Sequence, residues 1–355
     1  MSIKKQAYSK PYNIVYENTY PNLMIGPGIF NDKKEAFSNT PEKWIKSEIS
    51  EVEKNRQKQI FAVKNYSKID AVKNKSEITE LQNLIKSDKE TEVEINYNIK
   101  KLNINEKITG INNKALELEK IKIIDNIKVS RTVDKITGDT QIKAKDAIVE
   151  YYNKTKDVYK IEQLLSIGLL GLKKNRIFVP TRWSITSIDD ILGKEFFKEV
   201  ENNQTIDRFK MHKYTFYSNT FYVIFMPYSW SFEMFEYVNG NLIAQDYEIN
   251  TPKKEYANQI TGAYYAAREV VLEHLKKINK KASVIVLRDI DEKYNSKGVW
   301  VIREAIKESL EKEEIIFEDL NQVIEYIKEK LNLKWILQKS EILKGLKFQK
   351  RIFDF

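Results

Sequence analysis

Alternating apolar and polar residues predict strands in several parts of the chain. From Glu92 to Lys100, apolar side chains fall on every second position, which is the period of a half-buried strand. A continuous apolar run at 221–226 predicts a buried strand. The apolar runs at 232–238 and 242–249 flank Asn239-Gly240, a pair that favours a tight hairpin turn because both residues tolerate positive φ angles.

Apolar residues spaced three or four apart predict helices. The longest such pattern runs from Ala257 to Asn279 and places its apolar side chains on one face. Thr40 and Pro41 are residue types that favour a helix N-cap and first position, and that helix is expected to reach about Ile60. The pattern predicts one more buried strand, at 284–287, and further helices at 140–153, 158–168, 299–311 and 317–331.

These elements predict an α+β (mixed α/β) fold, in which a central sheet with hairpins is packed against helices. Four regions are expected: an N-terminal lobe at 1–100, a linker-like segment at 101–128, an α/β lobe at 129–332 and a flexible basic tail at 333–355. The linker is placed there because no aromatic residue occurs between Asn98 and Glu150, while charged residues and Asn are dense.

Residue usage excludes several kinds of chemistry. The chain contains no cysteine, which removes disulfides, thiol catalysis and cysteine-bound zinc. The two histidines, His212 and His274, are too few for a histidine-rich metal site. Any metal would be a hard ion such as Mg²⁺ or Mn²⁺, held by carboxylates. The chain lacks the run of about 18 apolar residues that a membrane span needs, and its N-terminus does not resemble a secretory signal, so a cytoplasmic protein is expected.

The net charge is +9, from 60 basic and 51 acidic residues. A positive excess favours association with polyanions, among which nucleic acid is the commonest in cytoplasm. A composition rich in Lys, Glu and Ile also suits a hot environment or an AT-rich genome, and that explanation stands beside the first.

The last seven residues form the best-defined short motif. Gln349, Ile352 and Phe355 are spaced so that, in one helical turn, the two apolar side chains enter one pocket while the Gln reaches its rim. Phe353 lies inside the same turn. This is the pattern of a peptide that binds a sliding clamp. The alternative is an apolar tail that folds back onto its own core.

A second cluster begins at Pro180. Arg182 beside Trp183, among Ser and Thr residues, suits phosphate contact combined with base stacking. Asp189 and Asp190 follow closely and are candidates for holding a divalent ion. The alternative is that Trp183 belongs to the core and Asp189 is a helix cap or a surface residue.

A third cluster lies on the strand expected at 232–238. Side chains alternate along a strand, so either Glu233 or Glu236 faces a sheet surface rich in apolar groups. A buried acid needs a partner, which makes a catalytic or metal-binding carboxylate one interpretation. The other is a buried salt bridge to an arginine, with these candidates: Arg268, Arg288 and Arg303.

Further anion sites are suggested by the helix expected to begin near Thr261, whose first N–H groups can receive a phosphate. Arg288 ends a predicted strand, and Arg303 follows it, at places where open α/β sheets bind ligands. The chain contains no Walker loop, no glycine-rich dinucleotide fingerprint and no GxSxG elbow. Nucleotide hydrolysis and acyl transfer are therefore not expected.

Many of these blocks together resemble the archaeal Nre (NreA-type) DNA-repair family. The resemblance covers most of residues 15–310 and the terminal peptide. Its blocks are Tyr20 to Gly28, Thr40 to Trp44, Val129 to Ala144, Asp157 to Gly171, Pro180 to Asp190, Trp230 to Glu233, Tyr256 to Arg268, Leu287 to Asp289 and Gly298 to Glu304. Unlike many relatives, which resemble zinc-ribbon proteins at the N-terminus, this chain has no Cys pairs.

The resemblance implies a role in DNA repair, with binding to the sliding clamp (PCNA) through Gln349, Ile352, Phe353 and Phe355. DNA would be contacted by the following residues: Arg182, Trp183, Arg268, Arg288 and Arg303. If the protein is an enzyme, a nuclease-like site is expected to use these acids: Asp189, Asp190, Glu233 and Glu236. A non-enzymatic adaptor between the clamp and another repair protein, and an RNA-binding protein, are the two alternatives.

Overall fold

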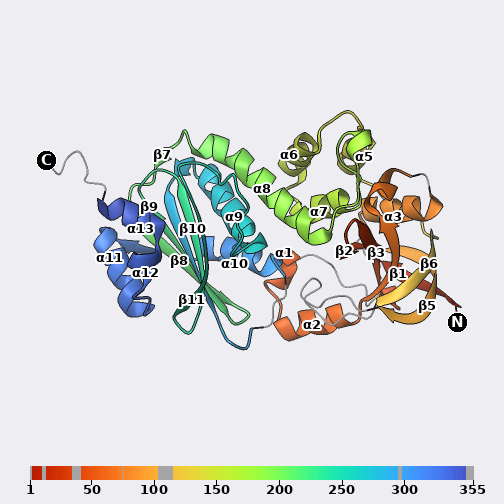
Figure 1. The fold of residues 1–355 in the computed structure, drawn as a ribbon, viewed down its shortest axis with the longest axis horizontal. Helices are drawn as coiled ribbons and strands as arrows, with labels where there is room; N and C mark the ends of the chain where they lie inside the picture. Colours follow the sequence, from red (N-terminus) through yellow and green to blue (C-terminus); the bar gives the residue numbers. More distant parts are fainter. Residues whose placement is uncertain are drawn as a thin grey trace. The chain divides into compact units, whose positions relative to one another are not determined.

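The computed structural model describes residues 2–9, 13–33, 41–73, 75–102, 115–294 and 298–348. Helices and mixed sheets form an α+β fold, as the sequence predicted (Figure 1). The chain divides into two compact units, Met1–Ile191 with Ser296–Gly298, and Leu192–Asn295 with Val299–Phe355. Within the described residues, no helix is both long and apolar enough to cross a membrane.

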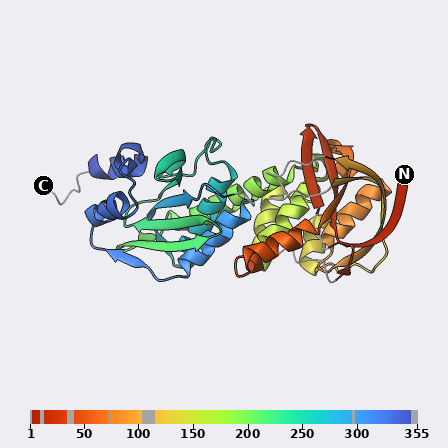
Figure 2. The ribbon, with the colours of Figure 1, turned by 90° about the horizontal axis from the view of Figure 1, so that it is seen from below.

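The strands of the first unit are β1 (Ser2–Ser9), β2 (Asn13–Thr19), β3 (Asn22–Ile29), β4 (Ile60–Ser67), β5 (Thr91–Leu102) and β6 (Ala115–Ile123). They pair in the order β1-β5-β6-β4-β3-β2. The β4–β6 pair is parallel and the other pairs are antiparallel. Two backbone hydrogen bonds between Tyr8 and Phe30 then bring β1 to the end of β3. Figure 2 shows these strands, coloured red to yellow, wrapping around one another near the N-terminus.

The helices of the first unit are α1 (Pro41–Trp44), α2 (Ile49–Gln57), α3 (Ser76–Lys86), α5 (Arg131–Gly138), α6 (Ala144–Thr155) and α7 (Val158–Ser166). Short 3₁₀ helices span Lys68–Val72 and Lys173–Asn175. The single helix expected from Thr40 to Ile60 is thus two helices that end before β4. On α3, the buried side chains recur at helical spacing and pack towards β6: Ile78, Leu81, Leu84 and Ile85.

The linker-like segment expected at 101–128 contains strand β6, which pairs with both β4 and β5. Apolar residues of β6 enter the core even though aromatic residues are missing: Leu118 and Ile121, three positions apart, are both buried. The boundary between the compact units falls instead after Ile191, inside helix α8 (Thr181–Val200).

The main sheet of the second unit consists of β8 (Phe209–Phe216), β9 (Asn219–Met226), β10 (Ser231–Val238), β11 (Asn241–Ile249), β13 (Ser283–Ile290) and β14 (Ile315–Phe317). Its order is β11-β10-β13-β9-β8-β14. The predicted hairpin is confirmed, because Asn239 and Gly240 have φ angles of 49° and 76° between β10 and β11. A small parallel pair joins β7 (Gln204–Thr205) to β12 (Lys280–Lys281).

Helices cover both faces of this sheet (Figure 1). One face carries α9 (Gly262–Lys277) and α10 (Trp300–Leu310), and Phe232 of β10 contacts Tyr264 of α9. The opposite face carries α11 (Leu320–Glu325), a π-helical turn at Tyr326–Lys330, α12 (Ile336–Lys339) and α13 (Glu341–Phe348). There Phe235 and Tyr237 pack in one apolar cluster with Ile336 and Leu343. Side chains on the two faces of β10 therefore pack against two different helical layers.

Candidate nucleic-acid interface

Two exposed aromatic rings lie side by side in the first unit. Tyr20 lies in the turn between β2 and β3, and Trp183 lies in the first turn of α8. Their ring centroids are 5.1 Å apart, with the planes tilted by 48°. The residues are 46% and 40% exposed, whereas the other tryptophans of the chain are buried or partly buried. Paired exposed aromatic rings form an apolar patch that is typical of a binding surface.

Basic side chains flank this aromatic pair. The ammonium group of Lys68 donates a hydrogen bond to the Tyr20 hydroxyl at 3.0 Å and lies 4.9 Å from the centroid of that ring. Arg182, next to Trp183, forms an ion pair with Glu17, and its side chain is still 59% exposed. We call these residues the Tyr20–Trp183 site: Glu17, Tyr20, Lys68, Arg182 and Trp183. It combines stacking surfaces with cations, which are the groups that recognise unpaired bases and phosphates.

Buried hydrogen bonds position the first turn of α8. The Val15 amide of β2 donates to the hydroxyl of Thr181 at 3.0 Å. The Ser184 hydroxyl donates to the Glu162 carbonyl of α7 at 2.6 Å. The Phe178 amide donates to the Lys68 carbonyl at 2.8 Å, which ties the segment before α8 to the 3₁₀ helix. These hydrogen bonds hold in place the first turn of α8, which carries Trp183.

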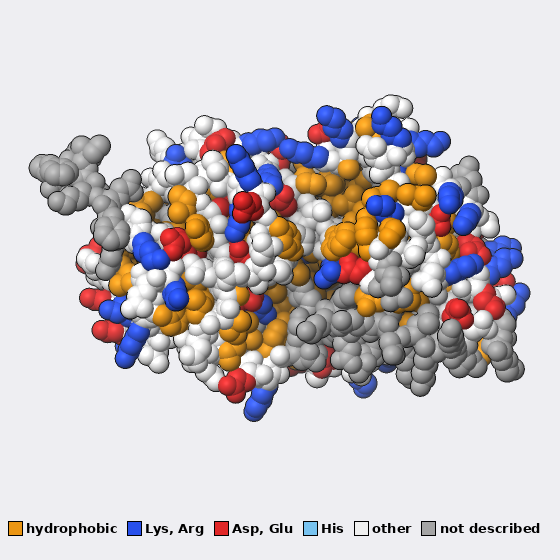
Figure 3. Space-filling view, viewed as in Figure 1, with side chains coloured by type: hydrophobic (Ala, Val, Ile, Leu, Met, Phe, Trp, Pro, Cys, Tyr) orange, Lys and Arg blue, Asp and Glu red, His pale blue; other side chains and the backbone are white. Residues whose placement is uncertain are grey.

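Figure 3 shows hydrophobic side chains gathered over α7 and its neighbouring loops, with Lys and Arg side chains among them. The alternative that Trp183 belongs to the core is wrong, because Trp183 is exposed. Sequence reasoning missed Tyr20 and Lys68, although the Tyr20-Pro21 turn between two apolar runs was a usable signal.

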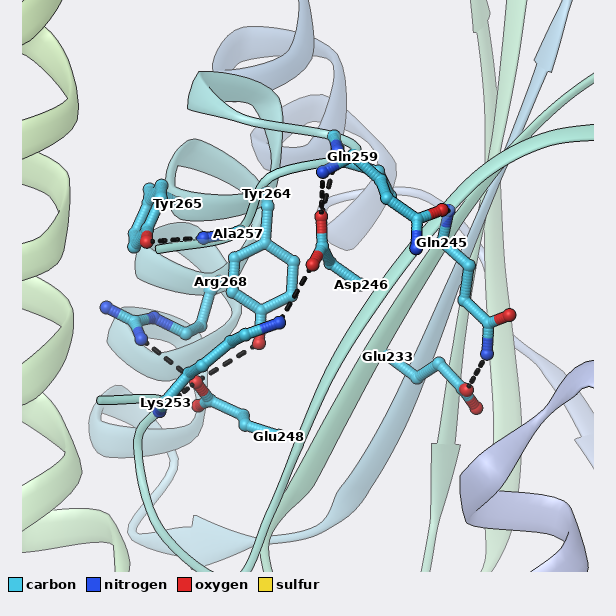
Figure 4. Close-up of polar contacts among 11 residues, drawn as sticks. Glu233, Gln245, Asp246, Glu248, Lys253, Ala257, Gln259, Tyr264, Tyr265 and Arg268 are labelled. Carbon is cyan, nitrogen blue, oxygen red and sulfur yellow. Dashed lines mark hydrogen bonds and ion pairs between the residues drawn. The ribbon is translucent and has the colours of Figure 1, made fainter. Parts of the chain in front are cut away.

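The three other arginines expected to contact DNA are buried: Arg268 is 0% exposed, Arg288 6% and Arg303 1%. Arg268 forms an ion pair with Glu248 at 2.9 Å, and both side chains are almost fully enclosed. The same Glu248 carboxylate accepts hydrogen bonds from the Tyr264 hydroxyl and from the indole of Trp230, both at 3.1 Å. Figure 4 shows Arg268 and Tyr264 of α9 directed at Glu248. Burial and the neighbouring carboxylate raise the pKa of the Tyr264 hydroxyl.

A second buried carboxylate occupies the anion position just before α9. Asp246 accepts hydrogen bonds from the backbone amides of Gln259 and Ile260 at 3.0 and 2.8 Å, and its other oxygen lies 2.8 Å from the Lys253 ammonium (Figure 4). The sequence suggested that a phosphate binds near this helix start. The protein supplies its own carboxylate to the amides that precede the helix.

The acids of β10 have separate structural partners. Glu236 forms an ion pair with Arg288 at 2.6 Å, which confirms the salt-bridge interpretation for this residue. Glu233 points to the other face of the sheet, where it accepts hydrogen bonds from the Ser340 hydroxyl and from the backbone amides of Glu341 and Ile342 at the start of α13. Burial raises the pKa of Glu233, and the hydrogen bonds that it accepts act in the opposite direction.

Asp189 is buried and Asp190 is partly buried, both on α8 within the first unit, whereas Glu233 and Glu236 belong to the second. Among the described residues, no group of three or more His, Asp or Glu side chains is arranged to hold a metal ion. The clamp-binding residues, Gln349, Ile352, Phe353 and Phe355, lie outside the described residues.

Comparisons with known proteins identify relatives along the whole chain. The family described as archaeal Nre, N-terminal, matches residues 2–241, and archaeal Nre, C-terminal, matches 248–355. The chain is 30% identical to DNA repair protein NreA of Archaeoglobus fulgidus over 89% of its own length and 82% of that protein. It is 34% identical to DNA repair protein NreA of Haloferax volcanii, over 66% of its own length and 58% of that protein.

A third relative is DNA repair protein NreB of Archaeoglobus fulgidus, 30% identical over 63% of this chain and 60% of that one. No solved structure matches the chain. The two family models together cover almost every residue of the chain, with the N-terminal model before the C-terminal one. The chain therefore belongs to the archaeal Nre family.

Proposed function

We propose that this chain is a DNA-repair protein that binds DNA through the Tyr20–Trp183 site and is recruited to DNA by a sliding clamp, which binds the peptide from Gln349 to Phe355. The relatives named above are DNA repair proteins, which supports the general role. The observation that carries the DNA-binding part is the exposed Tyr20–Trp183 pair with Lys68 and Arg182 beside it.

Among the five residues that the sequence suggested for DNA contact, Arg182 and Trp183 carry this proposal. Their side chains are exposed, so a phosphate and a base can reach them without rearrangement of the core. Contact by the other three arginines would first require their side chains to leave the interior of the second unit. Removing Arg268 from Glu248 would leave an unpaired charge in the core, at a cost of about 3–5 kcal/mol.

The clamp-binding part rests on the terminal motif and on its attachment. The motif directly follows α13, whose first turn is held against the sheet by Glu233. Ile342 and Leu343 of the same helix are buried in the apolar cluster of the second unit. The peptide therefore starts from an anchored helix, while its own anchor side chains, Ile352, Phe353 and Phe355, supply the apolar contacts that such a groove accepts.

A calorimetric titration tests recruitment. A sliding clamp from an archaeon is titrated with the full chain and with a version that ends at Phe348. We expect binding in the micromolar range or tighter for the full chain and its loss on truncation, because anchors of this type dominate such interfaces. Equal binding by both versions would move the contact elsewhere on the protein. Absence of binding by both would refute the recruitment part.

Metal-dependent cleavage by a nuclease-like site, with Asp189, Asp190, Glu233 and Glu236 as ligands for Mg²⁺ or Mn²⁺, is the enzymatic form of the proposal. The adaptor form is favoured by a specific observation: both oxygens of Glu233 are occupied by the start of α13, and Glu236 is paired with Arg288. Wild type and Asp189→Asn, both assayed with nicked and flapped DNA, separate the two forms. Absence of Mg²⁺-dependent cleavage by the wild type would support the adaptor. Loss of Mg²⁺-dependent cleavage in a folded variant would establish the enzyme. Undiminished cleavage by the variant would show that Asp189 is not part of a nuclease-like site.

A further inference from the structure

The strands of the first unit form a closed ring. β3 pairs with β4, β4 pairs in parallel with β6, β6 pairs with β5, and β5 pairs with β1. The hydrogen bonds between Tyr8 and Phe30 complete the ring by joining β1 to the end of β3. β1 pairs with β5, and the next strand, β2, pairs with β3. The first two strands together therefore pair with two different strands of the ring.

This pairing is that of an oligonucleotide/oligosaccharide-binding (OB) barrel. If β1 and β2 are taken as the first strand, then β3, β4, β5 and β6 are the second to fifth. The first strand pairs with the second and fourth, and the third pairs in parallel with the fifth. Helix α3 lies between the third and fourth strands, where such barrels carry a helix. OB barrels bind oligonucleotides on the face of their second and third strands, between the loops that follow the first and fourth strands.

Two residues of the Tyr20–Trp183 site belong to this region of the barrel, and Arg182 and Trp183 join them from α8. Tyr20 belongs to the loop between the first and second strands, and Lys68 directly follows the third strand. On the same strands, a hollow of about 610 Å³ opens where the pairing of β4 with β6 ends. Its lining residues include Met24, Lys64, Asn65, Asn98 and Glu119. The Asn65 amide there can donate hydrogen bonds to base edges, and the Glu119 carboxylate can accept them from base amino groups. The cations for phosphate are Lys68 and Arg182.

We infer that strands β1 to β6 of the first unit form an OB barrel whose ligand is single-stranded DNA, with bases stacked on Tyr20 and Trp183. This inference rests on the proposed DNA binding and deepens it. In a duplex the faces of the bases are covered by their neighbours, so exposed ring faces can only be used by unpaired bases. One OB barrel typically covers about 4–16 nucleotides. A DNA-repair protein with this specificity would engage the single strand exposed at a gap, a flap or an excised lesion.

Fluorescence anisotropy with labelled 15-nucleotide DNA, the same sequence as a duplex and the same sequence as RNA tests this inference on the full chain. We expect the single strand to bind at least about tenfold more tightly than the duplex. Stacking contributes about 1–3 kcal/mol per base, so Trp183→Ala is expected to weaken single-strand binding by about 5- to 150-fold. Trp183→Phe, which keeps a stacking face, is expected to retain most of the affinity.

Tyr247→Ala is the matched control. Tyr247 is a 42% exposed tyrosine of the second unit, with the Lys253 ammonium 5.9 Å from its ring, so it resembles Tyr20 in chemistry but lies outside the barrel. Unchanged binding by this variant, with loss in Trp183→Ala, would support the inference. Thermal unfolding of each variant shows whether it is folded, and Trp183→Phe preserves the test if the alanine variant is not.

The other outcomes separate this inference from the proposed function. Equal affinity for duplex and single strand, with no effect of Trp183→Ala, would overturn the single-strand assignment and leave DNA binding intact. Absence of binding to either DNA would overturn both. Tighter binding to RNA than to DNA would overturn the assignment of DNA as the ligand.

Discussion

Arg182 and Glu17 form an ion pair at the edge of the Tyr20–Trp183 site, and the second carboxylate oxygen of Glu17 is buried without a hydrogen-bond partner among the described residues. The pair holds the guanidinium beside Trp183, and at the same time Glu17 competes with any phosphate that approaches it. The affinity of the site for DNA is therefore set partly by this acid.

Glu17→Gln is expected to tighten single-strand binding. Because the Arg182 side of the pair is 59% exposed, the pair is worth about 0.2–1 kcal/mol, and we expect an increase of about 1.5- to 5-fold at moderate salt. Anisotropy titrations measure it. The control is Glu150→Gln, which removes another paired acid of the first unit, bound to Lys135 and Lys154. An equal gain in both variants would point to net charge, and weaker binding by Glu17→Gln would contradict our account of Arg182.

Trp183 should report binding directly. It is the most exposed of the tryptophans, so stacking of a base on its ring is expected to quench tryptophan fluorescence. Trp183→Phe is expected to abolish most of the quenching while retaining most of the affinity. Quenching of the same size in that variant would show that the bases contact another part of the protein.

Lys68→Ala tests the electrostatic part of the site. Each phosphate that a cation neutralises on a single strand contributes about 0.7 to the slope of log affinity against log salt. We expect the magnitude of this slope to fall by about 0.7 in the variant. The variant also loses the hydrogen bond from Lys68 that orients the Tyr20 ring. An unchanged slope would mean that Lys68 does not contact phosphate.

Glu248→Gln is expected to destabilise the second unit without altering the DNA site. The substitution leaves the buried Arg268 guanidinium without its charged partner and weakens the bonds from Tyr264 and Trp230. We expect the free energy of unfolding of this unit to fall by about 3–5 kcal/mol. Differential scanning calorimetry measures the change. A loss of single-strand affinity in the folded fraction would contradict the placement of the site in the barrel.

Acid is expected to destabilise the second unit through its histidines. Burial, with Lys210 nearby, lowers the pKa of His274 to about 4 and also lowers that of His212; Lys277 and Glu314 are further charges near His274. The folded state thus favours neutral rings, so the contribution of these histidines to stability is constant above about pH 6.5. It is lost as the pH falls from 6.5 to 4, by about 3 kcal/mol for His274. Unfolding of wild type and His274→Gln across this range measures the effect. Parallel pH profiles would contradict it.

Local signals predicted much of the fold. The hairpin at Asn239-Gly240, strand β5 and helix α9 follow from turn chemistry and periodicity within short windows. The barrel does not, because its closure depends on pairing between segments far apart in sequence, such as Tyr8 with Phe30. The weakly patterned β6 is held by two such partners, which is why it resembled a linker.

The site shows the same division. Arg182 and Trp183 are neighbours in sequence, so their chemistry was visible there. Tyr20 and Lys68 join them only through tertiary hydrogen bonds, among them Val15 to Thr181. The sequence indicated that Glu233 is a candidate buried acid that needs a partner. Its partners include the backbone amides of Glu341 and Ile342, and backbone groups cannot be predicted from residue types.

Photo-crosslinking tests the central claim most directly. Single-stranded DNA with bromodeoxyuridine at each position is irradiated with the full chain, and the crosslinked residues are identified by mass spectrometry. Our account predicts crosslinks at Trp183 and Tyr20. Crosslinks confined to the second unit would contradict it.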